Sequence, residues 1–231
     1  MIEIVKAKER YHFENEWLST YWHFSFDHYY DPKNVSFGHL RVFNHDFIKP
    51  GTGFPPHSHR DMEIITYVLR GELEHEDNQE NRGLIRAGEV QIMSAGTGIT
   101  HAERNPSATE LLELLQIWIL PNARGLPPRW EQRQFSPVAR QDVLLPVVSR
   151  KPVGDELAID QNATIYVSGL TQGRTIRHHL IGERAHLFVI DGKVALNQTR
   201  FDRWDSGRIT GDPDLSLTAL ETTELILLDL D

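Results

Sequence analysis

Short apolar stretches separated by polar turns run along most of the chain, a pattern typical of β-strands. Residues 64–69 (IITYVL) are rich in β-branched and aromatic side chains, Gly71 interrupts them, and residues 73–77 (LEHED) follow. After the polar turn at 78–83 (NQENRG), an apolar run resumes at 90–95 (VQIMSA). The pattern predicts strand, turn and strand through this part of the chain, as in an all-β protein.

A second set of apolar runs fills the later part of the chain. The first half ends with the apolar strand 111–120 (LLELLQIWIL), and residues 121–137 are rich in Pro, Gly and Arg, as in a connection laid across a surface. The later runs recur about every ten residues, which predicts a second small sandwich or barrel. They are 142–149 (DVLLPVVS), 163–170 (ATIYVSGL), 174–181 (RTIRHHLI), 186–197 (HLFVIDGKVALN) and 224–231 (ELILLDLD).

Helical periodicity is scarce, and residues 130–135 (WEQRQF) allow at most one or two helical turns. With 231 residues, the chain is long enough for one large or two small domains, each with its own core. We expect an N-terminal domain of residues 1–134 and a C-terminal domain of residues 135–231.

Composition excludes several classes of function. The chain has no cysteine, so disulfide frameworks, thiolate zinc sites, iron–sulfur clusters and cysteine nucleophiles are absent. The formal net charge of −9 argues against direct binding of nucleic acid, because such proteins use Lys and Arg to neutralise phosphates. The charged N-terminal decapeptide MIEIVKAKER is unlike a secretory signal, and no apolar run approaches the ~18 residues of a membrane span. We therefore expect a cytoplasmic protein that does not bind membranes.

Two short motifs carry candidate chemistry: His57 with His59, and His101 with Glu103. Residues i and i+2 of a β-strand point to the same face, so each pair offers two ligands on one side of one strand. Glycines precede both pairs and two prolines precede the first, which places the pairs near turns at the mouth of a barrel. If the two strands face each other, three imidazoles and one carboxylate form a mononuclear metal site without sulfur.

Most of the twelve histidines are expected to be ordinary surface or core residues. His178 and His179 are adjacent, so on a strand they point to opposite faces and cannot both bind one metal. Residues 203–217 supply no imidazole, so the metal is expected only in the first domain. The remaining candidates for a pocket wall, each more often plain core, are His23, His28, His45, Phe24, Phe26, Phe37, Phe54, Trp118 and Trp130.

The spacing Gly51-x₅-His57-x-His59-x₃-Glu63-x₇-Gly71 resembles the first cupin motif with one extra residue before its last glycine. The spacing Gly98-x₂-His101-x₃-Asn105 resembles the second, although Gly96 replaces the usual proline and the leading glycine is displaced. Longer stretches narrow the resemblance to the pirin family, most densely from about Trp17 to Pro121. These are WHFSFDHYYDP (22–32), HSHRDMEIITYVLRGELEHED (57–77) and MSAGTGITHAERN (93–105).

The resemblance implies a bicupin of two antiparallel β-barrel or jelly-roll domains, with a metal in the first and a degenerate second domain. It implies His57, His59, His101 and Glu103 as the metal ligands. Cupins generally use the position of Glu63 as a ligand, yet on an unbent strand Glu63 would lie ~13 Å from His59, at about 3.3 Å per residue. Glu103 needs no such bend, so we choose Glu103 and keep Glu63 as a supporting or substitute residue.

Four protein ligands on an octahedral metal leave up to two positions open, which suits a redox-active ion such as Fe(II) and dioxygen chemistry. Cu, Ni, Mn and Co remain open, and Zn would favour tetrahedral closure or one activated water. The resemblance implies quercetin 2,3-dioxygenase activity, in which O₂ cleaves a flavonol and carbon monoxide is released. Glu103 would then also be the general base for the flavonol 3-hydroxyl.

Two other functions remain open from the sequence. Some pirins act as metal- or redox-sensing partners of a transcription factor or a metabolic enzyme without turnover, which makes a protein partner the alternative. A zinc hydrolase or a sugar isomerase on the same scaffold is the third hypothesis.

Overall fold

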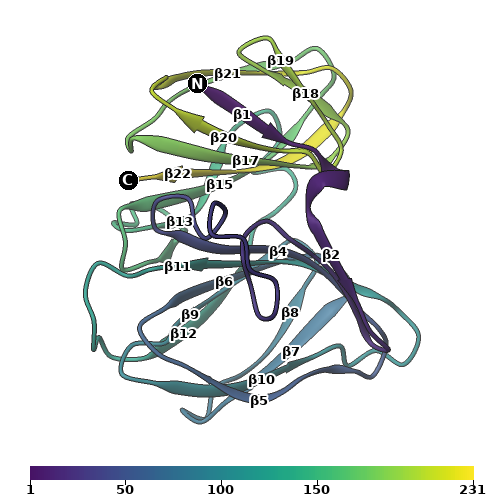
Figure 1. Ribbon diagram of the computed structural model, residues 1–231, viewed down its shortest axis with the longest axis vertical. Helices are drawn as coiled ribbons and strands as arrows, with labels where there is room; N and C mark the ends of the chain where they lie inside the picture. Colours follow the sequence, from purple (N-terminus) through teal and green to yellow (C-terminus); the bar gives the residue numbers. More distant parts are fainter. The chain divides into compact units, whose positions relative to one another are not determined.

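The computed structural model describes residues 1–231, which form two compact all-β units (Figure 1). The first barrel comprises Tyr11–Gln134 with Ile159–Gln161, and the second barrel comprises Met1–Arg10, Phe135–Ala158 and Asn162–Asp231. The single short helix is the 3₁₀ turn η1 (Ala7–Glu9). No helix of the chain has the length and apolarity that crossing a lipid bilayer requires.

These two units differ in two places from the expected domains of residues 1–134 and 135–231. The first ten residues belong to the second barrel, because strand β1 (Ile2–Val5) pairs antiparallel with β20 (Ser206–Thr210). Residues 159–161 belong to the first barrel, where the backbone N–H of Asn122 donates to the carbonyl of Asp160 over 2.7 Å. Both exceptions are backbone pairings between residues far apart in the sequence.

The first barrel consists of two antiparallel sheets. One has the strand order β12-β9-β6-β11-β4-β3-β2, and the other has the order β5-β10-β7-β8. Their bounds are β2 (Tyr11–Glu14), β3 (Leu18–Trp22), β4 (Leu40–Ile48), β5 (Gly53–His59), β6 (Glu63–Arg70), β7 (Glu72–Asp77), β8 (Arg82–Arg86), β9 (Glu89–Ser94), β10 (Ile99–Arg104), β11 (Leu112–Ile119) and β12 (Arg129–Gln134).

Residues 130–135, for which the sequence allowed one or two helical turns, lie almost entirely in strand β12. β12 pairs antiparallel with β9, from Trp130 opposite Met93 to Gln134 opposite Glu89. The helix preference of Glu, Gln and Arg is therefore overridden by cross-strand pairing, because propensity is a weak prior beside tertiary contacts.

The second barrel repeats the two-sheet plan. Its sheets have the orders β1-β20-β17-β22-β15-β13-β14 and β16-β21-β18-β19. The remaining bounds are β13 (Leu145–Ser149), β14 (Leu157–Ala158), β15 (Ala163–Leu170), β16 (Thr175–His179), β17 (Arg184–Asp191), β18 (Lys193–Leu196), β19 (Thr199–Asp202), β21 (Asp214–Ala219) and β22 (Thr223–Leu230).

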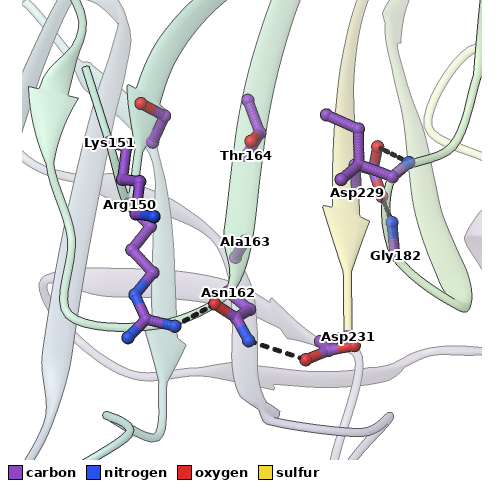
Figure 2. A pocket seen from close by; sticks show the side chains of 10 residues that line it. Arg150, Lys151, Asn162, Ala163, Thr164, Gly182, Asp229 and Asp231 are labelled. Atoms are coloured by element: carbon purple, nitrogen blue, oxygen red, sulfur yellow. Dashed lines mark hydrogen bonds between the residues drawn. The ribbon is translucent and has the colours of Figure 1, made fainter.

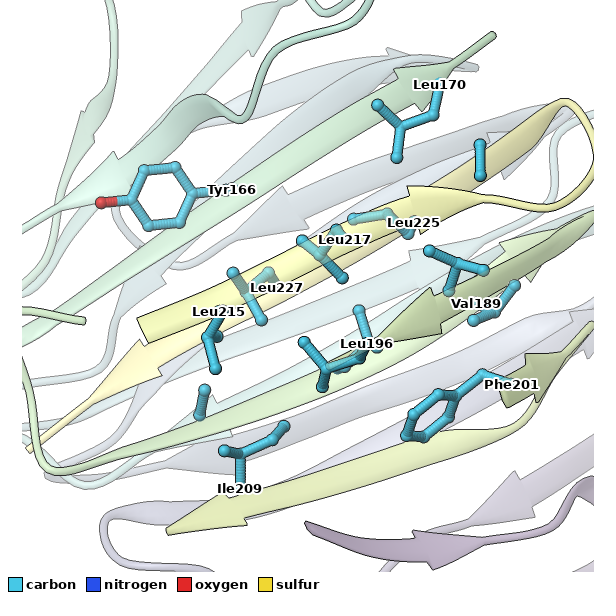
Figure 3. Close-up of a cluster of buried hydrophobic side chains, with 14 of the residues drawn as sticks. Tyr166, Leu170, Val189, Leu196, Phe201, Ile209, Leu215, Leu217, Leu225 and Leu227 are labelled. Carbon is cyan, nitrogen blue, oxygen red and sulfur yellow. The ribbon is translucent and has the colours of Figure 1, made fainter. Parts of the chain in front are cut away.

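The interiors of the two barrels differ in polarity. The second barrel is filled with aliphatic side chains, among them Leu196, Leu217 and Leu227 (Figure 3). The first barrel has two apolar clusters, and its central strands carry polar residues between apolar ones. On β6, Thr66 lies on the same face as Ile64 and Val68, two residues from each. Ile64 belongs to one apolar cluster and Val68 to the other. The alternation of a half-polar strand thus places hydrogen-bonding side chains inside this barrel.

These inward polar residues form one row across the sheet, which we call the polar row. Strand register aligns Gln91 with Thr66, Thr66 with Gln116, and Gln116 with Asn44. The amide of Gln91 donates to the Thr66 hydroxyl over 3.2 Å, and that hydroxyl donates to the Gln116 carbonyl oxygen over 3.1 Å. The row is therefore built by pairing of four strands that are separated in sequence.

Acid is expected to destabilise the second barrel through His186. This residue is fully buried on β17, where its neighbours Ala185 and Leu187 point into the barrel core, so its imidazole lies on the other face of the sheet. Burial, together with the charges of Arg208 and Arg10, lowers the pKa of His186 to about 3. The folded protein therefore holds the imidazole neutral.

Because the folded pKa lies below the unfolded value, stability is fully present above about pH 6.5 and is lost as the pH falls toward 3. Between pH 7 and pH 4 we expect wild type to lose about 3 kcal/mol more unfolding free energy than His186→Leu. Urea unfolding at both pH values measures this difference. The exposed His179→Ala variant should follow wild type, and parallel profiles for wild type and His186→Leu would contradict the expectation.

Candidate metal centre

Strands β5 and β10 bring the two histidine motifs together. They pair antiparallel with His57 directly opposite His101, as the two-residue spacing and facing strands require. The ring centroids lie 4.4 Å apart for His57 and His101, 5.0 Å for His59 and His101, and 4.8 Å for His57 and His59. One ring nitrogen from each of the three imidazoles lies within 4.8 Å of the others, close enough to hold one metal ion.

A close strand approach and a bulge position these side chains. A Cβ at Gly53 would lie 2.2 Å from the carbonyl oxygen of Glu103, so only glycine fits at this point of β5. The register shifts between His101 and Glu103, whose partners on β5 are His57 and Phe54. β5 therefore has one extra residue, and this stretch contains two prolines, which have no N–H to donate to the ladder.

His57 and His101 each have a ring nitrogen without a hydrogen-bond partner that can bind a metal. Nδ1 of His57 lies 2.8 Å from the Pro55 carbonyl oxygen, an acceptor, so Nδ1 carries the proton and the lone pair is on Nε2. His101 is 3% exposed, and neither of its ring nitrogens has a hydrogen-bond partner. Buried nitrogens without partners are rare in folded proteins, and a metal ion would satisfy one of them here.

Burial keeps the rings of His59 and His101 neutral. Burial lowers the pKa of His59 to about 4, with a further contribution from the charge of His57. Burial also lowers the pKa of His101 to about 4, while Glu103 acts in the opposite direction. At neutral pH both rings are uncharged, which is the form that ligates metals.

Glu103 is buried but ionised. The Gln91 amide donates to Oε1 over 2.9 Å, and the Gln116 amide donates to Oε2 over 3.1 Å. Burial alone would raise the pKa of Glu103. The imidazoles of His75 and His101 and the Gln91 amide outweigh burial and lower this pKa to about 2. Two members of the polar row thus hold both oxygens of a carboxylate at the wall of the imidazole cluster.

A further layer fixes the amide of Gln91 and the neighbouring imidazole. The indole N–H of Trp130 donates to Oε1 of Gln91 over 2.8 Å, which directs the Gln91 amide nitrogen toward Glu103. Trp130 also stacks on His75, with ring centroids 5.2 Å apart and planes 15° apart. Nε2 of His75 lies 3.2 Å from Oδ2 of Asp77, and its Nδ1 lies 3.9 Å from Oε1 of Glu103.

The first barrel thus holds two overlapping groups of metal-capable side chains. One consists of His57, His59 and His101, and the other consists of His75, His101 and Glu103. Glu63 belongs to neither group. The Ser94 hydroxyl donates to its Oε2 over 2.6 Å, and a nitrogen of the Arg129 guanidinium lies 3.7 Å from the same oxygen.

A cavity of about 500 Å³ adjoins the imidazoles and Glu103. Of the aromatic residues singled out in the sequence, Phe26, Phe54 and Trp118 line it, whereas Phe24, Phe37 and Trp130 do not. His23, His28 and His45 are also absent from its lining. Its other side chains are Phe13, Asn15, Trp17, Leu18, Trp22, Asp27, Asn44, Asp46, Ile64 and Gln116.

Sequence reasoning missed Gln91, Gln116, His75 and Asp46. The available signal was a single polar residue inside an otherwise apolar strand, as in VQIMS and LLQIWI. At an inward position such a residue must find a partner, so it indicates an interior polar network.

In the second barrel the candidate histidines have separate neighbours. Nε2 of His178 lies 3.2 Å from Oδ2 of Asp229, which also accepts the backbone N–H of Ile181 over 2.9 Å. The exposed His179 contacts Asp214 over 2.8 Å. No imidazole lines the nearby cavity of about 490 Å³. Figure 2 shows Arg150, Asn162 and Asp231 joined by hydrogen bonds at its edge.

Two β-barrels in one chain, with imidazoles on two paired strands of the first, define a bicupin. The family model described as Pirin matches residues 5–119, and the model described as quercetinase C-terminal cupin domain matches residues 146–230. The chain belongs to the pirin family.

Relatives match over nearly the full length of the chain. The chain is 42% identical to the quercetin 2,3-dioxygenase of Escherichia coli strain K12, covering 100% of this chain and 99% of that protein. It is 41% identical to a pirin-like protein of Caulobacter vibrioides, over 94% of both chains. The crystal structure of the bacterial pirin YhhW from Escherichia coli in complex with nickel(II) matches with a TM-score of 0.95 at 41% identity, covering 100% of this chain and 99% of that one.

Proposed function

We propose that this protein is a metal-dependent dioxygenase that cleaves a flavonol such as quercetin with O₂ and releases carbon monoxide. The observation that carries the proposal is the meeting of three imidazoles and one ionised carboxylate at the wall of an aromatic cavity. The quercetin 2,3-dioxygenase of Escherichia coli, which the chain matches along its whole length, supports the same activity.

His57, His59, His101 and Glu103 would hold the metal, because the three imidazoles lie together and His101 also lies beside the Glu103 carboxylate. This donor set contains no sulfur and suits Fe(II), which we propose as the working ion; Cu, Ni, Mn, Co and Zn also accept such donors. When bound, a redox-active divalent ion would supply the redox chemistry that couples the flavonol to O₂.

Glu103 would also accept the proton of the flavonol 3-hydroxyl. It is ionised at neutral pH and lines the cavity, and the amides of Gln91 and Gln116 fix both of its oxygens. A base held in this way needs little reorganisation when the hydroxyl arrives.

The cavity suits a flat aromatic substrate. Its volume of about 500 Å³ lies within the range of small-molecule sites. Trp17 and Phe54 meet edge to face with centroids 5.0 Å apart, and Trp118 packs edge to face on His59 with centroids 4.8 Å apart. These rings would hold the flavonol by apolar contact and exclude water from the reacting atoms.

The test is anaerobic reconstitution with Fe(II), followed by quercetin and then air. We expect loss of the flavonol absorbance, consumption of O₂ and release of carbon monoxide, with a His101→Ala protein as the inactive control. If quercetin stays intact with Fe(II) and with the other divalent ions, the dioxygenase proposal fails. The alternative is then a metal- or redox-sensing protein that binds a macromolecular partner without turnover.

A further inference from the structure

The cavity has a second polar wall that the metal centre does not use. Asn44 and Asp46 lie two residues apart on β4, so their side chains share the inner face of the seven-stranded sheet. The imidazoles come from β5 and β10 of the other sheet (Figure 1). Asn44 is 4% exposed and Asp46 is 3% exposed, and both line the cavity.

The hydrogen bonds on this wall are incomplete. The hydroxyl of Thr20, on the adjacent strand β3, donates to Oδ1 of Asp46. The structure has no hydrogen bond to the other carboxyl oxygen of Asp46, and Oδ1 of Asn44 also lacks a partner. Buried polar atoms are paired in the great majority of cases, so the unpaired Oδ1 of Asn44 indicates a group that binds a ligand. The second oxygen of Asp46 is not fully buried, and it is open to the same ligand from the cavity.

A purely structural role does not explain these residues. The rest of the polar row forms bonds within itself and to Glu103. Asp46 does not belong to that network. It lies two residues beyond Asn44 on β4, and its partner on β11 is Leu114. Burying a carboxyl group is costly unless the group is hydrogen-bonded, and the Thr20 hydroxyl bonds only one of the two oxygens of Asp46. Burial and, to a lesser extent, the charge of Glu103 outweigh the Thr20 bond and raise the pKa of Asp46 to about 7, so near neutral pH the group can donate as well as accept.

We propose that Asn44 and Asp46 form a second subsite that binds a phenolic hydroxyl of the flavonol, apart from the oxygens held at the imidazole cluster. The inference rests on the proposed function and adds a determinant of specificity. The hydroxyl donates to Asp46 or accepts from it, and Thr20 fixes the orientation of the carboxyl group. The subsite favours polyhydroxylated flavonols over 3-hydroxyflavone, which carries only the 3-hydroxyl.

The test measures binding to Zn(II)-loaded protein by quenching of the fluorescence of the cavity tryptophans, so it does not depend on turnover. Quercetin and 3-hydroxyflavone are titrated into wild type, Asp46→Leu, Asp46→Asn and Phe54→Leu. We expect Asp46→Leu to weaken quercetin about tenfold, as for one lost hydrogen bond, and to leave 3-hydroxyflavone within about twofold. Asp46→Asn should restore most of the affinity, because an amide can still bond to the hydroxyl.

Phe54→Leu is the matched control, since it changes an apolar part of the same cavity and should affect both flavonols alike. If Asp46→Leu does not fold, Thr20→Val replaces it, because loss of the orienting hydroxyl should produce the same selectivity in weaker form. Equal effects on both flavonols, or no effect on quercetin, would overturn the subsite while wild-type turnover of quercetin leaves the proposed function intact. Selective binding without turnover by the Fe(II) protein would support the subsite and overturn the dioxygenase. Absence of flavonol binding to wild type would overturn both.

Discussion

A His101→Ala variant is expected to lose most of its bound metal and its flavonol turnover. His101 is common to both groups of metal-capable side chains, and its ring centroid lies 4.4 Å from that of His57 and 5.3 Å from that of His75. Mutating a residue that only orients a ligand costs about 10–100-fold in metal affinity, so deleting a ligand should cost more. Elemental analysis of protein purified without chelators or affinity metals, followed by chelator competition, measures the loss.

His178→Ala is the control for this experiment. It removes an imidazole that contacts Asp229 in the second barrel and belongs to neither metal-capable group. The control should keep wild-type metal content and turnover. Loss of metal in His178→Ala, with retention in His101→Ala, would place the metal in the second barrel and contradict the proposed site.

The local parts of this site could be predicted from the sequence because they depend on short-range geometry. The two-residue spacing of His57 with His59, and of His101 with Glu103, fixes a common face on any strand. The turns around them indicated that the strands change direction there. The structure shows His57 and His101 directly opposite each other, as required for convergence.

The carboxylate clamp could not be predicted, because it depends on register between distant strands. Gln91 and Gln116 reach Glu103 from β9 and β11, which both pair with β6 but not with each other. A one-residue slip in either pairing would turn its glutamine out of the barrel. The sequence shows that each glutamine interrupts an apolar strand but does not give the strand order. The pairing of β1 with β20 could not be predicted either, because it also joins strands far apart in the sequence.

A Glu103→Gln variant is expected to keep its metal but lose turnover, because Glu103 is assigned both as a ligand and as the general base. Glutamine retains one oxygen donor and nearly the same shape, so this variant should hold more metal than His101→Ala. It cannot accept the proton of the 3-hydroxyl, and loss of a general base costs about 10²–10⁴ in rate. Its own NH₂ group would also face the donating amide of Gln91 or Gln116, so one of the two bonds that orient Glu103 is lost.

Glu63→Gln is the matched control, because Glu63 is equally buried in the same barrel and differs from Glu103 mainly in its neighbours. Its Oε2 accepts the Ser94 hydroxyl, and a glutamine oxygen can accept it equally well. Metal content and the rate of flavonol loss are measured for both variants after the same Fe(II) loading. We expect Glu63→Gln to match wild type in both measurements. If Glu63→Gln loses its metal while Glu103→Gln keeps both metal and turnover, the two carboxylates exchange roles and Glu63 becomes the ligand.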